Sequence, residues 1–136
     1  MSDKRIYELD GARFSTLEEF YEEVSRVLIP GADWGRNLDA FNDILRGGFG
    51  TPAGGFILRW KDSERSRTRL GHKETVRQLE LRLKSCHPSN RKLVRHQIRD
   101  AKAGRGETIF DTLLDIISYH TQGGPESQDG VELELL

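Results

Sequence analysis

The sequence predicts an α/β fold in two layers, with a three-stranded parallel sheet in the order 1-2-3 and helices packed on one face. Three short strand-like segments, at residues 5–9, 56–60 and 131–136, are separated by long helical stretches. Connections of that length are crossovers, which join parallel strands. Residues 56–60 are apolar at nearly every position, which is typical of a central strand. Because crossovers are right-handed, connections that advance in one direction place the helices on the same face.

Local signals mark the first strand and the first helix. Arg5 to Leu9 forms the strand, and Asp10-Gly11 is the turn that follows. Ser15 or Thr16 caps the helix, and Glu19 completes a capping-box pattern with Thr16. The helix carries a broad apolar stripe that Pro30 closes: Leu17, Phe20, Tyr21, Val24, Val27 and Leu28.

The second helix contains two acidic residues on one face. Asn37 is its expected N-cap, and Gly47 is placed to end it in a left-handed conformation. Leu38, Phe41, Ile44 and Leu45 repeat at helical spacing. Asp39 and Asp43 are therefore i and i+4, with no base four residues along to neutralise them. A like-charge pair at this spacing is unfavourable, which points to a role outside the fold.

The sequence of the second half of the chain predicts three further helices and an edge strand. Phe49 to Gly54 is a breaker cluster that precedes the central strand, Phe56 to Trp60. Glu74 to Cys86 forms one helix, and Ser89 caps the next, which Gly104 and Gly106 end. Thr108 to His120 is the most apolar helix and is expected to lie against the sheet. The final VELELL alternates as an edge strand.

Length and cysteine content restrict the class of protein. A chain of 136 residues makes one domain, residues 1–136, that buries about 68–70% of its unfolded surface, so it needs no metal or disulfide to fold. Cys86 has no second cysteine to pair with, which favours a reducing compartment. Residues 1–10 lack an apolar signal core, and no run reaches the roughly 18 apolar residues of a membrane span. We expect a cytoplasmic protein without a cofactor.

Charge is distributed unevenly along the chain. Residues 1–61 hold 8 Lys and Arg against 10 Asp and Glu, residues 62–106 hold 13 against 5, and residues 107–136 hold 0 against 7. The three blocks carry −2, +8 and −7, which sum to the net charge of −1. Such a field can steer partners or pair internally.

The motif WGRNLDAFNDIL and the order of elements resemble the barstar family of intracellular ribonuclease inhibitors. The residues that carry the resemblance are Trp34, Gly35, Asn37, Leu38, Asp39, Ala40, Asp43 and the strand ending in Trp60. It covers the first 60 residues, and the final helix and strand resume the pattern. Between them, a basic helical insertion at about residues 65–105 is longer than the corresponding part of the best-known members.

The resemblance implies inhibition by substrate mimicry rather than catalysis. An acidic helix enters the active site of a small guanyl-specific ribonuclease in a one-to-one complex, and Asp39 and Asp43 carry over as the acidic contacts. The expected partner-binding residues are Asp33, Trp34, Gly35, Arg36, Asp39, Asn42, Asp43 and Arg46. The chain departs from the family by placing Asp33, Asn42 and Gly48 where aromatic contacts are expected, and by the positive charge of Arg36. Some members add an acid from the last helix, where this chain has Asp111 and Asp115.

Other interpretations remain open at this point. Asp39 would also interact favourably with the helix macrodipole, and for Trp34 a loop anchor that packs on the core is favoured over a ligand contact. Cys86-His87 has no second pair at metal spacing, and the four histidines are expected to be solvated. An immunity protein for a different toxin is one alternative function. Another alternative is a nucleic-acid-binding module that uses the basic helices. The basic charges would then bind phosphates; otherwise they form a solvated face or pair with the acidic C-terminal block.

Overall fold

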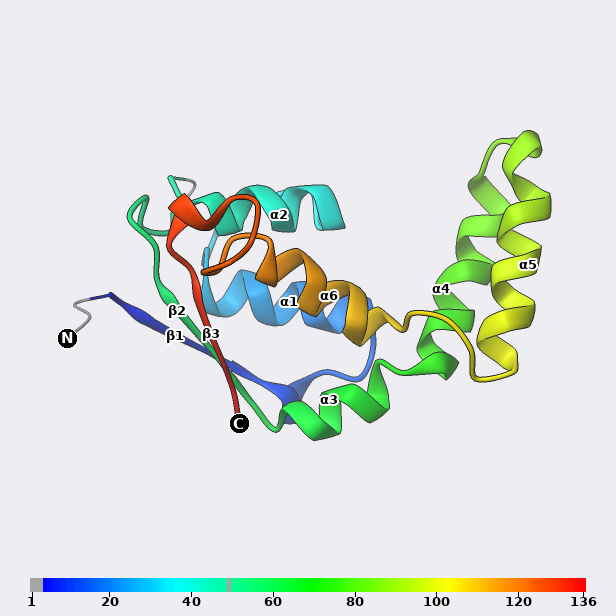
Figure 1. The fold of residues 1–136 in the computed structure, drawn as a ribbon, viewed down its shortest axis with the longest axis horizontal. Coiled ribbons are helices and arrows are strands. Elements are labelled where there is room, and N and C mark those ends of the chain that lie inside the picture. Colours follow the sequence, from blue (N-terminus) through cyan, green and yellow to red (C-terminus); the bar gives the residue numbers. More distant parts are fainter. Residues whose placement is uncertain (1–3, 49) are drawn as a thin grey trace.

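A computed structural model describes residues 4–48 and 50–136, and it confirms the predicted α/β fold. Strands β1 (Ile6–Asp10), β2 (Ile57–Lys61) and β3 (Glu132–Leu135) are all parallel and lie in the order β1-β2-β3. The register places Leu58 of β2 opposite Tyr7 of β1 and Leu133 of β3. Helices α1 (Leu17–Val27), α2 (Leu38–Arg46) and α6 (Ile109–Ser118) cover one face of this sheet (Figure 1).

The two faces of β2 have different environments, which explains why the sheet needs only one layer of helices. Leu58 and Trp60 are completely buried beneath the helices. Arg59 points to the opposite face, where its guanidinium lies 2.8 Å from Glu134 of β3 and 4.0 Å from Glu8 of β1. Cross-strand ion pairs therefore cover the face that no helix covers.

An aromatic cluster centred on Trp60 joins the sheet to the helices. Its ring stacks on Phe20 of α1 with centroids 5.6 Å apart and contacts Phe110 of α6 at 5.3 Å. Phe20 in turn contacts Phe41 of α2 at 5.3 Å. The indole N–H of Trp60 donates to Ser66 Oγ at 2.9 Å, so the polar edge of this large side chain is also satisfied.

The predicted helix ends are confirmed for α1 and α2, with two local differences. Thr16 Oγ1 accepts from the Glu19 N–H, but the Glu19 carboxylate reaches back to the N–H of Ser15 instead of Thr16. Asn37 Oδ1 accepts from the Ala40 N–H at 2.8 Å, as expected of an N-cap. Gly47 ends the helix with φ of 86°, in the left-handed region as expected, but its ψ of 170° differs from that of the left-handed helical conformation. A Cβ at Gly47 would lie 2.5 Å from Pro52 O, and this close approach requires glycine.

Two elements of the basic block differ from the prediction. Helix α3 (Ser63–Arg69) was not expected, because its buried residues are serines and it has no apolar stripe. Contacts from outside the helix hold it: Ser63 Oγ donates to Leu136 O, and Arg67 lies over the ring of Phe110 at 4.7 Å. The prediction that Ser89 caps the next helix is wrong, because Ser89 lies in a short 3-10 helix, Pro88–Asn90, and Asn90 is the N-cap of α5. The breaker cluster expected from Phe49 begins on a residue that lies outside the described residues.

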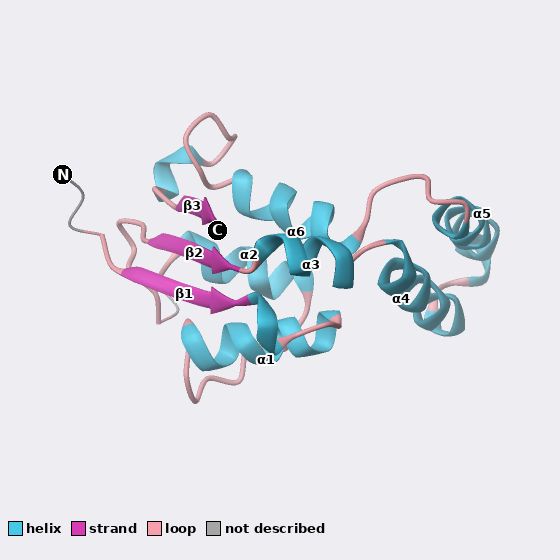
Figure 2. Ribbon diagram, turned by 90° about the horizontal axis from the view of Figure 1, so that it is seen from below, coloured by secondary structure: helices cyan, strands magenta, loops and turns pink. Residues whose placement is uncertain are grey.

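Helices α4 (His72–Ser85) and α5 (Arg91–Lys102) form a hairpin that extends beyond the sheet (Figures 1 and 2). The buried residues of α5 are Val94, Ile98 and Ala101, and α4 is its main neighbour. The expectation that all helices share one face of the sheet is therefore wrong for this pair. A hairpin buries its apolar stripes internally, so it needs no place on the sheet.

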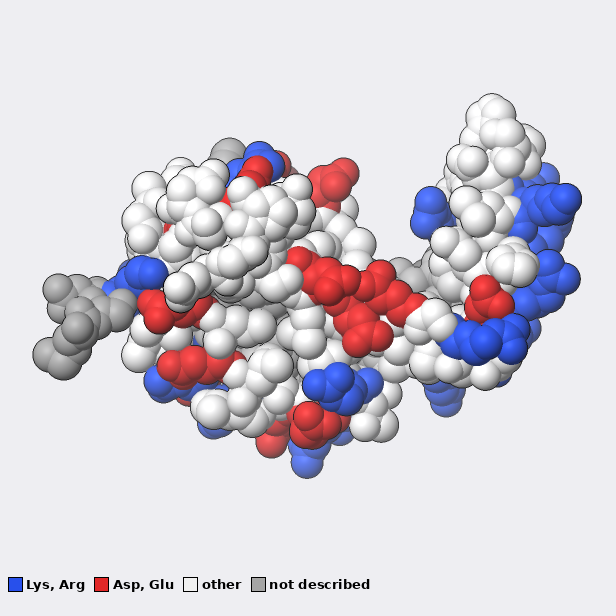
Figure 3. Space-filling view, in the orientation of Figure 1, with Lys and Arg blue, Asp and Glu red and all other residues white. Residues whose placement is uncertain are grey.

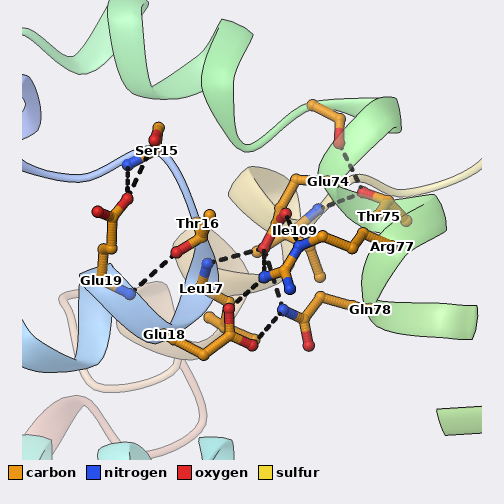
Figure 4. Close-up of polar contacts among 11 residues, drawn as sticks. Ser15, Thr16, Leu17, Glu18, Glu19, Glu74, Thr75, Arg77, Gln78 and Ile109 are labelled. Carbon is orange, nitrogen blue, oxygen red and sulfur yellow. Dashed lines mark hydrogen bonds and ion pairs between the residues drawn. The ribbon is translucent and has the colours of Figure 1, made fainter. Parts of the chain in front are cut away.

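A buried carboxylate attaches the hairpin to the body (Figure 4). Glu74 of α4 is 5% exposed and accepts from the N–H of Leu17, the first residue of α1, at 2.8 Å. Arg77 binds Glu74 and also Glu18 of α1. On the other side, Thr75 Oγ1 accepts from the N–H of Ile109, the first residue of α6. The hairpin thus supplies acceptors to the N-terminal ends of two helices of the body.

The charge of Glu74 should contribute to stability in a pH-dependent way. Burial alone raises the pKa of Glu74, but hydrogen bonds from Arg77, the Leu17 N–H and Gln78 together lower it below the ordinary value. The stabilisation is therefore present above the ordinary carboxyl pKa of 4.5 and is lost as the pH falls through the lowered value. We expect Glu74→Gln to reduce the free energy of unfolding at neutral pH by about 1.5–3 kcal/mol.

Denaturant unfolding at a series of pH values measures this effect. The difference between Glu74→Gln and the wild type should shrink as the solution is acidified. Glu80→Gln, at an exposed position of the same helix, is the control and should change stability by no more than about 0.5 kcal/mol. An equal loss for Glu74→Gln at every pH would show that the charge contributes nothing.

Candidate functional site

The two predicted acidic contacts are both exposed on α2. Asp39 lies in the first turn of the helix and Asp43 one turn later, on the same face. Asp43 is not isolated, because its Oδ1 lies 3.3 Å from Nη1 of Arg46, three residues along. Both members of this pair are about half exposed, so the interaction is weak and the carboxylate remains accessible.

Arg46 links α2 to the loop that precedes β3. Its guanidinium binds Glu126 with Nε 3.2 Å from Oε2, and this hydrogen bond raises the pKa of Arg46. The chain positions are 80 residues apart. Arg46 was predicted to contact the partner, and the structure places its guanidinium between two carboxylates of its own chain.

Asn42 is also engaged inside the protein. His120, at the end of α6, is completely buried, and its Nε2 lies 2.6 Å from Asn42 Oδ1. Nδ1 of the same ring lies 2.6 Å from Asp129 Oδ2. The expectation that all four histidines are solvated is wrong for His120. Local sequence gives no sign of this, because its partners come from α2 and from the loop before β3.

The ring of His120 has an acceptor oxygen on each side. It donates from both nitrogens when it carries two protons. With one proton, the Asn42 amide can turn over and donate to Nε2, which preserves both contacts. In either form the ring connects α2 to the C-terminal loop.

The same cluster is where metal-ligating side chains come together. One ligand atom from each of His120, Glu126 and Asp129 lies within 4.8 Å of the others, and among the described residues no further group of this kind occurs. In the structure these atoms already form a network, because Asp129 binds the ring and Glu126 binds Arg46. Cys86 and His87 are not part of it.

The loop before α2 combines an anchored aromatic residue with exposed charges. Trp34 is half-buried, its Nε1 donates to Ser25 Oγ at 2.6 Å, and its ring meets Tyr21 edge-on at 5.5 Å. Gly35 and Arg36 have φ of 79° and 49°. Asp33, Gly35 and Arg36 are exposed. The interpretation of Trp34 as a loop anchor agrees with these contacts.

Helix α6 lies beside α2 and brings a second group of acids to the same side (Figure 1). Asp111 is half-buried and forms a capping box with Thr108, so its carboxylate serves the helix end. Asp115 is exposed, and a hydrogen bond with it raises the pKa of Glu107. Acidic side chains gather over the N-terminal part of α6 in Figure 3. Of the two candidate acids in this helix, Asp115 is the exposed one.

A cleft of about 530 Å³ lies where the body meets the hairpin. The first residue of α2, Leu38, lines it, together with Glu107 of the acidic group. On the hairpin side, Gln97 Oε1 is buried without a hydrogen-bond partner among the described residues. The hairpin therefore stands next to the N-terminal end of the acidic helix.

The two charged blocks do not neutralise each other. The C-terminal acids pair with the first block instead: Glu126 with Arg46, Glu132 with Lys4, and Glu134 with Arg59. Within the part of the chain that the structure describes, no ion pair joins residues 62–106 to the acids of residues 107–136. Of the two explanations for the basic block, a solvated face or pairing with the acidic C-terminal block, the pairing is wrong.

Comparison with known proteins gives a family match. The family described as Barstar (barnase inhibitor) matches residues 4–87, which include β1, α1, α2, β2, α3 and α4. Helix α5 lies beyond the matched segment. A search of curated proteins found no match. Among the described residues, none of the helices has the length and apolar character needed to cross a membrane.

Neighbouring residues of α2 should respond differently to truncation. Asn42→Ala leaves His120 Nε2 buried without its partner, so we expect a loss of about 1–3 kcal/mol in the free energy of unfolding. Asp43→Ala removes an exposed ion pair and should change it by less than about 1 kcal/mol. Denaturant unfolding of the two variants at neutral pH tests the contrast. A larger loss for Asp43→Ala would mean that the roles are reversed.

Proposed function

Because the chain belongs to the barstar family, we propose that it is a stoichiometric inhibitor of a small guanyl-specific ribonuclease. The observation that carries the proposal is the pair of exposed carboxylates, Asp39 and Asp43, on one face of a helix within the matched segment. In this proposal α2 enters the active site of the enzyme, and its carboxylates take the places of RNA phosphates. The protein itself hydrolyses nothing.

The chemistry of the pair suits such a target. A carboxylate offers two acceptor oxygens and can bind an arginine through two parallel hydrogen bonds. A ribonuclease must present cations to the phosphates of its substrate, so its active site attracts an acidic surface. Asp115 of α6, on the neighbouring helix, is the third carboxylate that we assign to this surface.

Rigid support of α2 favours tight binding. Phe41, Ile44 and Leu45 anchor its inner face in the core. Thr51 Oγ1 donates to Ile44 O at 2.9 Å, and Asn42 meets His120 along its side. A helix that is already fixed loses little conformational freedom on binding, so less of the interaction free energy is lost to ordering.

The differences from the family motif bear on the choice of target. Asp33 and Asn42 stand where aromatic contacts are expected, and Asn42 is already bound to His120. Arg36 adds an exposed positive charge next to the acidic pair. Aromatic side chains usually anchor interfaces, so a target bound without them must rely more on charge. An immunity protein for a different toxin with a cationic active site is the second candidate, because the same acidic surface would serve it.

The location follows from the proposed target. An inhibitor of this kind protects the RNA of the cell that makes it, which places it in the cytoplasm. The free thiol of Cys86 is compatible with a reducing compartment.

Replacing each carboxylate tests the proposal with barnase as the first probe. Asp39→Asn and Asp43→Asn should each weaken inhibition at least about 30-fold, mainly through faster dissociation; the underlying free-energy range itself draws on the complex of barnase with barstar. Asp39→Asn should also lose about 0.3–1 kcal/mol of stability, because its charge is favourable in the first helical turn. Asp43→Asn should keep its stability within about 1 kcal/mol, because its ion pair is exposed.

Glu22→Gln, an equal charge change at an exposed position of α1, is the matched control and should inhibit as well as the wild type. Titration of RNA cleavage against inhibitor gives the stoichiometry, which should be one to one. Two results would contradict the proposal. One is RNA cleavage by the purified protein alone, and the other is full inhibition by Asp43→Asn together with a melting temperature several degrees lower.

A further inference from the structure

A groove on the α4–α5 hairpin is lined mainly by basic side chains. It has a volume of about 680 Å³, with Leu83 and Ile98 between the charges and Glu80 as the acidic member among the described lining residues. The basic residues are Lys84, Lys92, Arg95, Arg99 and Lys102. Lys and Arg side chains collect on the part of the hairpin turned away from the sheet in Figure 3.

These five cations are not neutralised by the protein. Across residues 4–48 and 50–136, none of them forms an ion pair, whereas Arg46, Arg59 and Arg77 each bind at least one carboxylate. Like charges held close together repel one another, which is unfavourable for the free protein. A bound polyanion would remove this repulsion.

The cations of α5 form a row. Lys92, Arg95, Arg99 and Lys102 follow one another at intervals of three, four and three residues, which places them along one side of the helix. The row is about 15 Å long, at 1.5 Å per residue. Lys84 of α4 lines the same groove. A linear array of this kind suits a ligand that carries one negative charge after another.

We propose that the hairpin groove binds the phosphate backbone of a nucleic acid without reading its sequence. Lys and Arg are the side chains that most often contact phosphate, and such contacts carry no sequence information by themselves. Helices α4 and α5 contain no Phe, Tyr or Trp on which a base could stack. The ligand is therefore recognised by its charge density.

An acidic protein segment fits this groove less well. A helix or strand of a protein partner needs an apolar floor for its own apolar side chains, and here two apolar residues stand against five cations. The site is also separate from the acidic surface on α2 and α6, so a nucleic acid and a ribonuclease can be held at the same time. Helix α5, which supplies four of the five cations, lies outside the segment matched to the family.

Binding of a labelled single-stranded RNA of about 16 nucleotides, measured by fluorescence anisotropy, tests the proposal. With five phosphate contacts, log K should fall against log salt with a slope of about −3.5, so that affinity drops roughly 100-fold between about 50 and 200 mM salt. The double variant Arg95→Glu and Arg99→Glu should reduce this slope by about 1.4 or more and weaken binding at least tenfold at low salt. DNA of the same sequence should bind similarly, because the phosphate spacing and charge are shared.

The matched control changes the net charge equally at exposed positions outside the groove. Arg65→Glu with Lys73→Glu should bind RNA within about threefold of the wild type and keep the salt slope. Circular dichroism confirms that both double variants are folded. The proposal is overturned if the wild type does not bind RNA at low salt, or if the control loses as much affinity as the test variant. It is also overturned if labelled polyglutamate with the same number of charges binds more tightly than the RNA and loses that binding in the test variant, because the ligand would then be an acidic polypeptide.

Discussion

The packing around Trp60 is the constraint on which the layers depend. This side chain is completely buried near the end of the central strand, with rings of Phe20 and Phe110 at 5.6 and 5.3 Å. Phe41 of α2 joins the same cluster through Phe20. Aromatic rings of this size interlock in few arrangements, so the cluster restricts how α1, α2 and α6 can lie on the sheet. The indole N–H donates to Ser66 Oγ, and this hydrogen bond connects α3 to the same cluster.

In the proposed inhibitor, the acidic helix serves both the fold and a partner. Its inner face is buried, and its flank is bound to His120 through Asn42. Arg46, at its end, holds Glu126. Two of the predicted partner-binding residues, Asn42 and Arg46, thus also support the helix, while the carboxylates of Asp39 and Asp43 are exposed. This division explains how a surface with two like charges stays ordered before it meets a target.

The hairpin adds a second charged surface of opposite sign. It is attached through Glu74, whose carboxylate satisfies the N-terminus of α1 and pairs with Arg77. Because hydrogen bonds and ion pairs depend on direction, this junction holds the hairpin in one orientation. The apolar contacts of α5 are made mainly with α4. The protein therefore keeps its acidic and basic surfaces apart, as the two proposed binding roles require.

The sequence by itself determined the parts of the structure that depend on neighbours along the chain. The three strands, the caps Thr16 and Asn37, and the placement of Asp39 and Asp43 on one face follow from short-range patterns. The parallel order of the strands follows from the length of the connections between them. Only the tertiary structure decided the burial of His120, the helical state of α3 and the direction of the hairpin. Each of these rests on contacts between distant residues, such as His120 with Asn42, Ser63 with Leu136, and Glu74 with Leu17. A polar side chain has the same local signature whether it is solvated or buried, and its partner appears only when the chain is folded.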